Sequence, residues 1–202
     1  MTIPPPVLSA DAAGEELALA ALLRGEVVAL PTETVYGVAV VPDKPGAVTR
    51  LFAAKQRPAD VAVAVLVADS HQALELSGQT LPPRLIEHYW PGPLTVVVAR
   101  RPGLEWDLGG DPNTIGIRCP DHPLVRSLCR RVGPLATTSA NRHGEPTPDS
   151  AAAVAFALAG SGVALVLDGG LCAGTPSTVV DLTGEQPRVL REGAVAEIDL
   201  LA

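Results

Sequence analysis

The chain contains only two lysines, and one of them, Lys55, forms a Lys-x-Arg pair with Arg57. Two closely spaced cations can bind the phosphates of a nucleotide, and a guanidinium can hold a phosphate or carboxylate through two parallel hydrogen bonds. A Lys-x-Arg pair at the end of a helix can also simply complement the negative end of the helix dipole. Taken alone, the pair leaves both roles open.

Three further segments place hydroxyl groups or an arginine beside apolar runs. Residues 32–37 (TETVYG) follow the apolar run 27–30, and residues 137–141 (TTSAN) lead from another run into a loop. Thr114 and Arg118 are four apart on an extended segment, so both side chains can face the same side. Ligands of open α/β sheets gather at strand ends, although threonine and serine there are also common turn and cap residues. The combination indicates an anion-binding cleft, and no GxxxxGK[ST] or GxGxxG motif specifies its ligand.

Alternating helical and extended segments must position these groups. A first helix is predicted between a cap at Ser9 or Asp11 and Gly25, and a second begins at Pro45 and ends with Lys55 and Arg57. Further helices are predicted over 70–76, 83–89, 122–131 and 148–159, and strands over 26–30, 61–68, 94–99, 114–118, 135–138, 163–167, 177–182 and 188–190. The predicted helices and strands lack the regular strand–helix alternation of one half of a Rossmann fold. Their order predicts an α/β or α+β fold with one large, twisted, mixed sheet.

Composition limits the classes of protein that this chain can belong to. With 202 residues, 47% of them hydrophobic, the chain can bury a core without metals or disulfides, and we expect one domain over residues 1–202. The net charge of -7 argues against a protein whose main role is to bind nucleic acid phosphates, although a local basic cleft remains compatible with it. The three cysteines and four histidines show no zinc spacing, so no metal site is predicted.

Nothing in the sequence is typical of a membrane or secreted protein. The first residues lack the charged and apolar regions of a signal peptide. The longest uncharged run, 150–167, is interrupted by Gly160 and Gly162, which predicts a helix, a turn and a buried strand instead of a membrane span. We therefore expect a cytoplasmic protein that does not associate with membranes.

At the residues singled out above, the sequence resembles the YrdC-like family, the threonylcarbamoyl-adenylate synthases, in its short, single-domain bacterial type. The likeness extends from residue 27 to about residue 195, and its motifs occur in the family's order. They are PTETVYG (31–37), KQRP (55–58), WPGPLTVVV (90–98), TIGIRCPDHPLV (114–125), TTSANRHGEPTP (137–148), PSTVVDLTG (176–184) and VLREGAV (189–195). Any one of these motifs would be weak support, whereas seven in order are strong.

The resemblance implies a twisted open α/β sheet with a large cleft, and a specific reaction. L-threonine, bicarbonate and ATP, with Mg²⁺, would give threonylcarbamoyl-AMP and pyrophosphate, and a transferase complex would then modify adenosine 37 of tRNA. Lys55 and Arg57 would bind the ATP phosphates and act in catalysis, and Arg118 would bind the threonine carboxylate. The rest of the ATP site would be Thr114, Ser139, Asn141, Thr147 and Arg191, and the rest of the threonine site Thr32, Thr34, Tyr36 and Ser177, with Tyr36 lining the cleft.

Two alternatives and one departure from the family's pattern stay open. The family's concave surface can also be that of an RNA-binding module, for which weak tRNA or RNA binding would be expected, although the net charge of -7 disfavours tight binding. A related enzyme with another substrate is the second alternative, and the intact Ser139 and Asn141 beside Lys55 favour the synthase. Many relatives carry a histidine soon after the Lys-x-Arg motif, whereas this chain has the apolar run 61–66.

Overall fold

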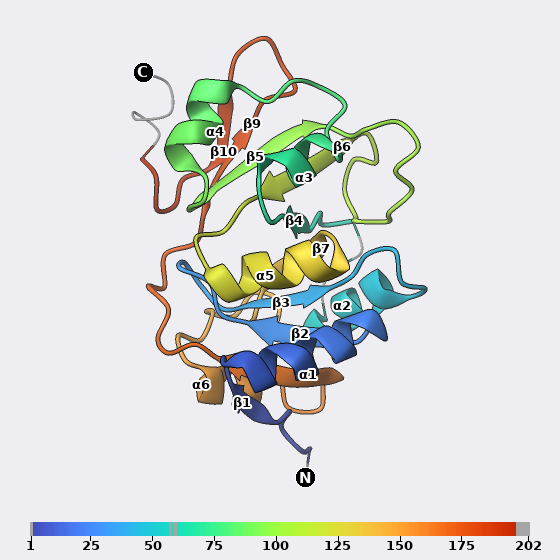
Figure 1. Ribbon diagram of the computed structural model, residues 1–202, viewed down its shortest axis with the longest axis vertical. Helices are drawn as coiled ribbons and strands as arrows, with labels where there is room; N and C mark the ends of the chain where they lie inside the picture. The colour runs from blue at the N-terminus through green and yellow to red at the C-terminus, as the bar shows by residue number, and fades with distance from the viewer. Residues whose placement is uncertain (1, 57, 59, 197–202) are drawn as a thin grey trace.

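The computed structural model describes residues 2–56, 58 and 60–196, and within them ten strands form one mixed sheet in the order β1-β8-β2-β3-β7-β4-β6-β5-β9-β10 (Figure 1). The strands are β1 (Val7–Ser9), β2 (Val27–Leu30), β3 (Gly37–Val40), β4 (Ala64–Leu66), β5 (Leu94–Ala99), β6 (Thr114–Arg118), β7 (Leu135–Ser139), β8 (Val163–Asp168), β9 (Thr178–Asp181) and β10 (Arg188–Arg191). The helices are α1 (Ala12–Leu23), α2 (Ala47–Lys55), α3 (Ser70–Leu74), α4 (Pro83–Tyr89), α5 (Pro123–Val132) and α6 (Ala151–Ala157). The predicted fold class, a mixed sheet flanked by helices, is confirmed.

The alternation of side chains along each strand divides the interior into two cores. In β2, Val27 and Ala29 belong to one core, and Val28 and Leu30 belong to the other. Helices α1 and α5 pack on the face of Val28, while α2 and α6 supply side chains to the core that contains Val27. Both faces of the sheet are therefore covered here, which explains why β2 and β3 are buried along their whole length.

Local signals fix the ends of α1 as the sequence predicts. The Asp11 Oδ1 atom accepts a hydrogen bond from the backbone N–H of Gly14 at 2.9 Å, so Asp11 is the cap residue and Ser9 is the last residue of β1. Gly25 has a φ of 74°, which is the left-handed conformation that ends a helix at low cost when the residue is glycine.

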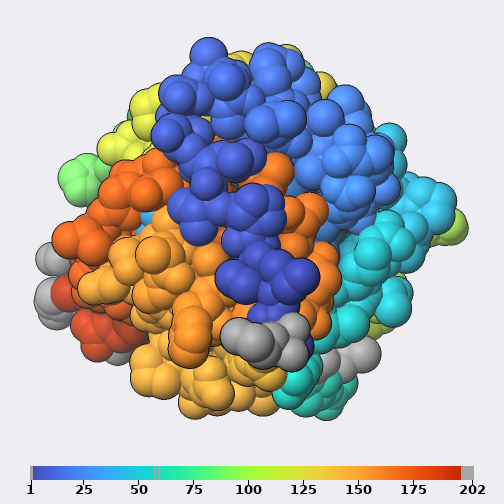
Figure 2. All heavy atoms as spheres, turned by 90° about the horizontal axis from the view of Figure 1, so that it is seen from below, coloured from blue at the N-terminus to red at the C-terminus, as the bar shows by residue number. Residues whose placement is uncertain are grey.

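The central pairing of the sheet joins two groups of strands. On one side lie β1, β8, β2, β3 and β7, and on the other lie β4, β6, β5, β9 and β10. The chain between β8 and β9 passes from one group to the other, as the orange and red trace in Figure 1 shows. Figure 2 shows the molecule from below, at the edge of the sheet formed by β1. The blue N-terminal segment lies against orange residues there, and β1 pairs in parallel with β8.

Three strands differ from the sequence prediction by more than one residue at an end. β1 and β3 were not predicted, because runs of three and four residues are too short to show a period. β4 covers only Ala64–Leu66 of the predicted strand over 61–68, since the N–H of Val63 binds the carbonyl of Leu108 in a loop. Among the residues that the structure describes, no helix is both long and apolar enough to cross a membrane.

Adjacent leucines of α1 provide a matched test of this packing. Leu22 is fully buried between α1 and the sheet, whereas Leu23 is 50% exposed. We expect Leu22→Ala to lower the free energy of unfolding by about 3 kcal/mol, because it removes buried methyl groups and leaves a cavity. Leu23→Ala is expected to change it by less than about 0.5 kcal/mol. Urea denaturation of both variants measures the difference, and equal losses would contradict the proposed packing.

Candidate functional site

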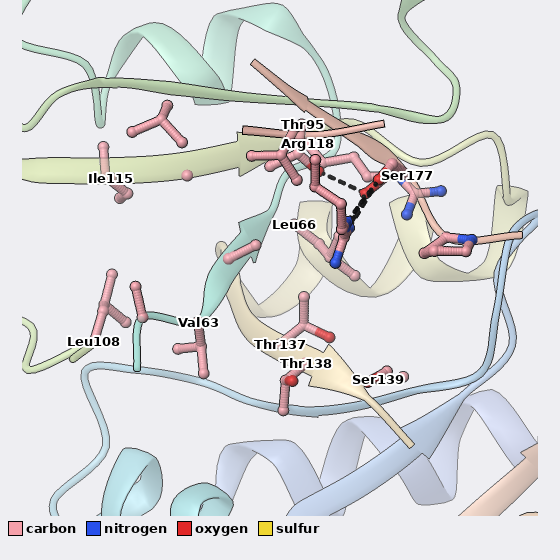
Figure 3. Close-up of a pocket in the computed structure, with 18 of the residues that line it drawn as sticks. Val63, Leu66, Thr95, Leu108, Ile115, Arg118, Thr137, Thr138, Ser139 and Ser177 are labelled. Atoms are coloured by element: carbon pink, nitrogen blue, oxygen red, sulfur yellow. Dashed lines mark hydrogen bonds between the residues drawn. The ribbon is translucent and has the colours of Figure 1, made fainter. Parts of the chain in front are cut away.

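A cavity of about 350 Å³ lies across the central strands, at the level where β7, β4, β6 and β5 meet. Figure 3 shows that one end is apolar, with Val63, Leu108 and Ile115, and that the other end is polar. Polar residues of the wall come from both groups of strands and include Thr95, Thr114, Arg118, Thr137, Ser139 and Ser177. A cavity of this size, with an apolar end and a few convergent polar groups, is typical of a small-molecule site.

Arg118 is the most deeply buried charge in the cavity wall. Its side chain projects from β6, and its Nε atom donates to the carbonyl of Gly92 at 3.1 Å. Its Nη2 atom lies 2.7 Å from Oε1 of Glu33, which comes from the turn between β2 and β3. Thr114 also lines the cavity, so the expectation that Thr114 and Arg118 face the same side is confirmed.

Thr32 holds the turn that carries Glu33. Its Oγ1 accepts hydrogen bonds from the N–H groups of Thr34 and Val35, at 3.2 and 3.1 Å, and lies 2.6 Å from the carbonyl of Val35, to which it donates. The Thr32 hydroxyl is thus engaged within the turn, although the residue touches the cavity. Thr34 is buried beside it and does not contribute to the cavity wall. Their predicted contacts with threonine stay predictions.

Tyr36 differs from what the sequence indicated. We expected it to line the cleft, but its side chain is fully buried and is not part of the cavity wall. Its hydroxyl donates to the carbonyl of Gly170 at 2.7 Å and accepts from the N–H of Gly169 at 3.2 Å. Burial raises the pKa of Tyr36 to about 12, so the hydroxyl stays protonated and can donate. Tyr36 therefore anchors the connection between β8 and β9 that leads to Ser177.

Lys55 joins the end of α2 to the end of β7. Its Nζ atom donates to the carbonyl of Ser139 at 2.5 Å and to Asn141 Oδ1 at 3.1 Å, and it lies 3.3 Å from Ser139 Oγ. Asn141 Oδ1 also accepts from Thr147 Oγ1 at 3.1 Å. The structure thus brings four of the predicted ATP-binding residues together in one network, of which Ser139 reaches the cavity wall. Arg57, the second residue of the predicted catalytic pair, lies outside the described residues.

Ser177 and Arg191 form the opposite wall. The Nε and Nη2 atoms of Arg191 donate to the Ser177 carbonyl at 3.2 and 2.8 Å, and the hydroxyls of Ser177 and Thr95 lie 2.9 Å apart. Burial, and then the neighbouring charge of Arg118, lower the pKa of Arg191 from its usual value. The guanidinium groups of Arg118 and Arg191 thus lie at one cavity in a protein whose net charge is -7.

The sequence analysis missed Arg100, which also lines this cavity. Its Nε atom donates to the carbonyl of Thr114 at 3.2 Å, and Nη1 donates to that of Trp106 at 2.7 Å. Burial lowers its pKa from the usual value for arginine. The residue directly follows β5, so the strand-end rule that singled out the other segments could have identified it.

The described part of the chain contains no group of three or more His, Cys, Asp or Glu side chains that could hold a metal ion. Cys119 and Cys129 are buried, and burial raises the pKa of the Cys119 thiol to about 11. The described cysteines are therefore protonated at neutral pH, which makes them poor metal ligands and nucleophiles.

Comparison with known proteins places the chain in a family. The model of the family Sua5/YciO/YrdC, described as "Telomere recombination", matches residues 20–193. The chain belongs to the Sua5/YciO/YrdC family. A putative threonylcarbamoyl-AMP synthase of Mycobacterium tuberculosis (strain H37Rv) is 43% identical over 184 residues, which cover 89% of this chain and 83% of the relative. The threonylcarbamoyl-AMP synthase of Bacillus subtilis (strain 168) is 40% identical over 185 residues, 88% of this chain and 53% of that relative.

Solved structures of the Sua5/YciO/YrdC family share the fold. Sua5 of Pyrococcus abyssi in complex with L-threonine superposes with a TM-score of 0.87 and 33% identity, over 99% of this chain and 60% of that one. YciO of E. coli has a TM-score of 0.82 at 24% identity, over 96% and 95% of the two chains, which establishes the fold alone. This chain thus spans about 60% of the Pyrococcus chain and about half of the Bacillus relative.

The two asparagines of the chain, Asn141 and Asn113, provide a test of the Lys55 network. Asn141 is buried and binds Lys55, Thr147 and two backbone carbonyls, whereas Asn113 is exposed. We expect Asn141→Ala to lower the free energy of unfolding by about 2 kcal/mol, because it leaves buried polar groups without partners. Asn113→Ala should change it by less than about 0.5 kcal/mol. Urea denaturation measures both, and a similar effect of the two substitutions would contradict a structural role for this network.

Proposed function

We propose that this protein synthesises L-threonylcarbamoyl-AMP from L-threonine, bicarbonate and ATP and releases pyrophosphate, for the N6-threonylcarbamoylation of adenosine 37 in tRNA. The observation that carries the proposal is the buried Arg118 beside Ser177 in the cavity of a family member whose relatives bear this activity in their names. A solved relative, Sua5 of Pyrococcus abyssi, is named as complexed with L-threonine, which supports the same substrate here.

In this proposal, the threonine carboxylate binds Arg118. A buried guanidinium forms strong, charge-assisted hydrogen bonds with a carboxylate, since little water competes for either group. The hydroxyls of Ser177 and Thr95, 2.9 Å apart in the same wall, can bind further oxygen atoms of the substrate. Thr32, at the edge of the cavity, provides a third polar surface for threonine.

The triphosphate binds between Ser139 and Arg191, which line opposite walls of the cavity. Lys55 lies directly behind Ser139, so its positive charge acts across a short distance in a poorly hydrated environment. Thr114 lines the same cavity, and Lys55 donates to Asn141, which also accepts a hydrogen bond from Thr147. The nucleotide enters as MgATP, in which the phosphates and water coordinate the ion.

The chemistry needs positioning and charge more than a covalent nucleophile. The threonine amine and bicarbonate give a carbamate and water; a carbamate oxygen then attacks the α-phosphorus, and the bond to the leaving pyrophosphate breaks. Arg118 fixes the threonine end, while Lys55 and Arg191 stabilise the negative charge that builds on the phosphates. The product would pass to a tRNA threonylcarbamoyl transferase complex, and we propose that both act in the cytoplasm.

The proposed reaction is tested by pyrophosphate release from MgATP, measured with and without L-threonine and with and without bicarbonate. We expect release only when both are present, because the carbamate that attacks ATP contains atoms of each. Pyrophosphate release that does not depend on threonine would contradict the proposed function. A folded protein that releases no pyrophosphate under any of these conditions would also contradict it.

The two lysines supply a matched pair for the ATP site. We expect Lys55→Met to reduce the rate of pyrophosphate release by at least about 100-fold, because a preorganised charge beside the phosphates is lost. Lys44 precedes α2, is not part of the cavity wall and, among the described contacts, forms no hydrogen bond with Ser139 or Asn141, so Lys44→Met should retain activity close to that of the wild type. Circular dichroism confirms that both variants are folded, and a fully active Lys55→Met variant would refute the role of Lys55.

A further inference from the structure

The contact between Glu33 and Arg118 leaves both groups incompletely bonded. Their closest atoms lie 2.7 Å apart, and their side chains are 22% and 8% exposed. Nevertheless, both carboxylate oxygens of Glu33 and the Nη2 atom of Arg118 are shielded from solvent and form no hydrogen bond within the described residues. The contact is therefore an ion pair without the alignment of a hydrogen bond. A buried carboxylate can accept about four hydrogen bonds, and leaving it unbonded is unfavourable.

The carboxylate of Glu33 is not needed to form the turn on which it lies. Thr32 Oγ1 alone binds the N–H groups of Thr34 and Val35 and the carbonyl of Val35. His122 is a second titratable group near Glu33, but burial lowers its pKa and so favours the neutral ring. Neither the backbone nor a second cation therefore accounts for a carboxylate in contact with Arg118, which lines the cavity.

We propose that Glu33 and Arg118 together form a receptor for the two charges of a free α-amino acid. The substrate carboxylate replaces Glu33 on Arg118, and the substrate ammonium binds the carboxylate oxygens of Glu33. This inference rests on the proposed function in one respect, namely that Arg118 binds the carboxylate of the substrate. It adds a specificity residue, Glu33, and a requirement for the ammonium group of the ligand.

Charge balance gives the physical reason for such a receptor. Without ligand, Glu33 and Arg118 neutralise each other, which limits the cost of keeping two charges away from water. A zwitterionic amino acid exchanges one ion pair for two, so every buried charge keeps a partner. A ligand with a carboxylate but no ammonium would instead bring two carboxylates to one guanidinium. The site therefore selects against simple carboxylic acids by charge repulsion as well as by lost contacts.

Titration calorimetry in bicarbonate-free buffer tests the receptor without turnover. The two ligands are L-threonine and its analogue of the same configuration in which a hydroxyl replaces the ammonium group. We expect wild-type protein to prefer L-threonine by at least about tenfold, the size of one charge-assisted contact. Equal affinity of the wild type for both ligands would overturn the inference without the need for any variant.

Glu33→Gln keeps the size of the side chain and removes its charge. We expect this variant to bind L-threonine at least about tenfold more weakly than the wild type, because the ammonium group loses its carboxylate partner. The variant should bind the hydroxyl analogue as well as the wild type or better, because no carboxylate occupies Arg118. Glu26→Gln is the control, since it breaks the exposed ion pair with Arg24 and should change neither affinity.

The other outcomes separate the two proposals. If Glu33→Gln raises the affinity for both ligands equally, Glu33 only competes with the ligand for Arg118. If the substitution lowers both affinities equally, or unfolds the protein, the role of Glu33 is structural. Either result overturns the receptor while threonine-dependent pyrophosphate release by the wild type still supports the proposed function. If the wild type does not bind L-threonine, the proposed function fails, and the other common amino acids with their hydroxy analogues test the receptor. Binding of none of these would overturn it.

Discussion

The positive charge of Arg118 is held on an inner strand of the sheet, where the side chain is only 8% exposed to water. A buried guanidinium is stable only when neighbouring groups compensate for its lost hydration, so the structure around it is constrained from several directions. The carbonyl of Gly92 must point at Nε, and the turn between β2 and β3 must bring Glu33 across from the other group of strands. This charge therefore links β6 to the turn between β2 and β3, and neither of those strands pairs with β6.

A second set of contacts, made by Lys55 and Tyr36, joins segments that lead into the cavity wall. Lys55 connects the end of α2 to Ser139 and Asn141 at the end of β7, and Tyr36 connects β3 to the residues that follow β8. Both side chains are almost completely buried, and both bind backbone groups of segments that lead into the cavity wall. The polar surface of the site is thus positioned mainly by side chains that lie behind it.

Periodicity and strand-end position predicted much of this arrangement, and the reasons for the failures are physical. The bounds of β5 and β6 agree with the prediction because each is a clear extended run between turn signals, and the two-residue period correctly placed Thr114 and Arg118 on one face. β1 and β3 were missed because runs of three and four residues show no clear period, and each also pairs with a strand far along the chain, β8 and β7 respectively. The same holds for Glu33 and Tyr36, whose roles depend on residues that are close in space and remote along the chain. The grouping of Lys55 with Ser139 and Asn141 came from family resemblance and not from spacing.

The order of strands in the sheet also determines how the chain must fold as it is synthesised. β1 and β2 emerge first, but both pair with β8, where Val28 lies opposite Leu165. β1 and β2 can pair with β8 only after most of the chain has been synthesised. Folding that depends on such distant pairings is slow. Ser177 and Arg191 come later still. The cavity is thus among the last parts to be completed, so a partly synthesised or truncated chain would lack part of the cavity wall.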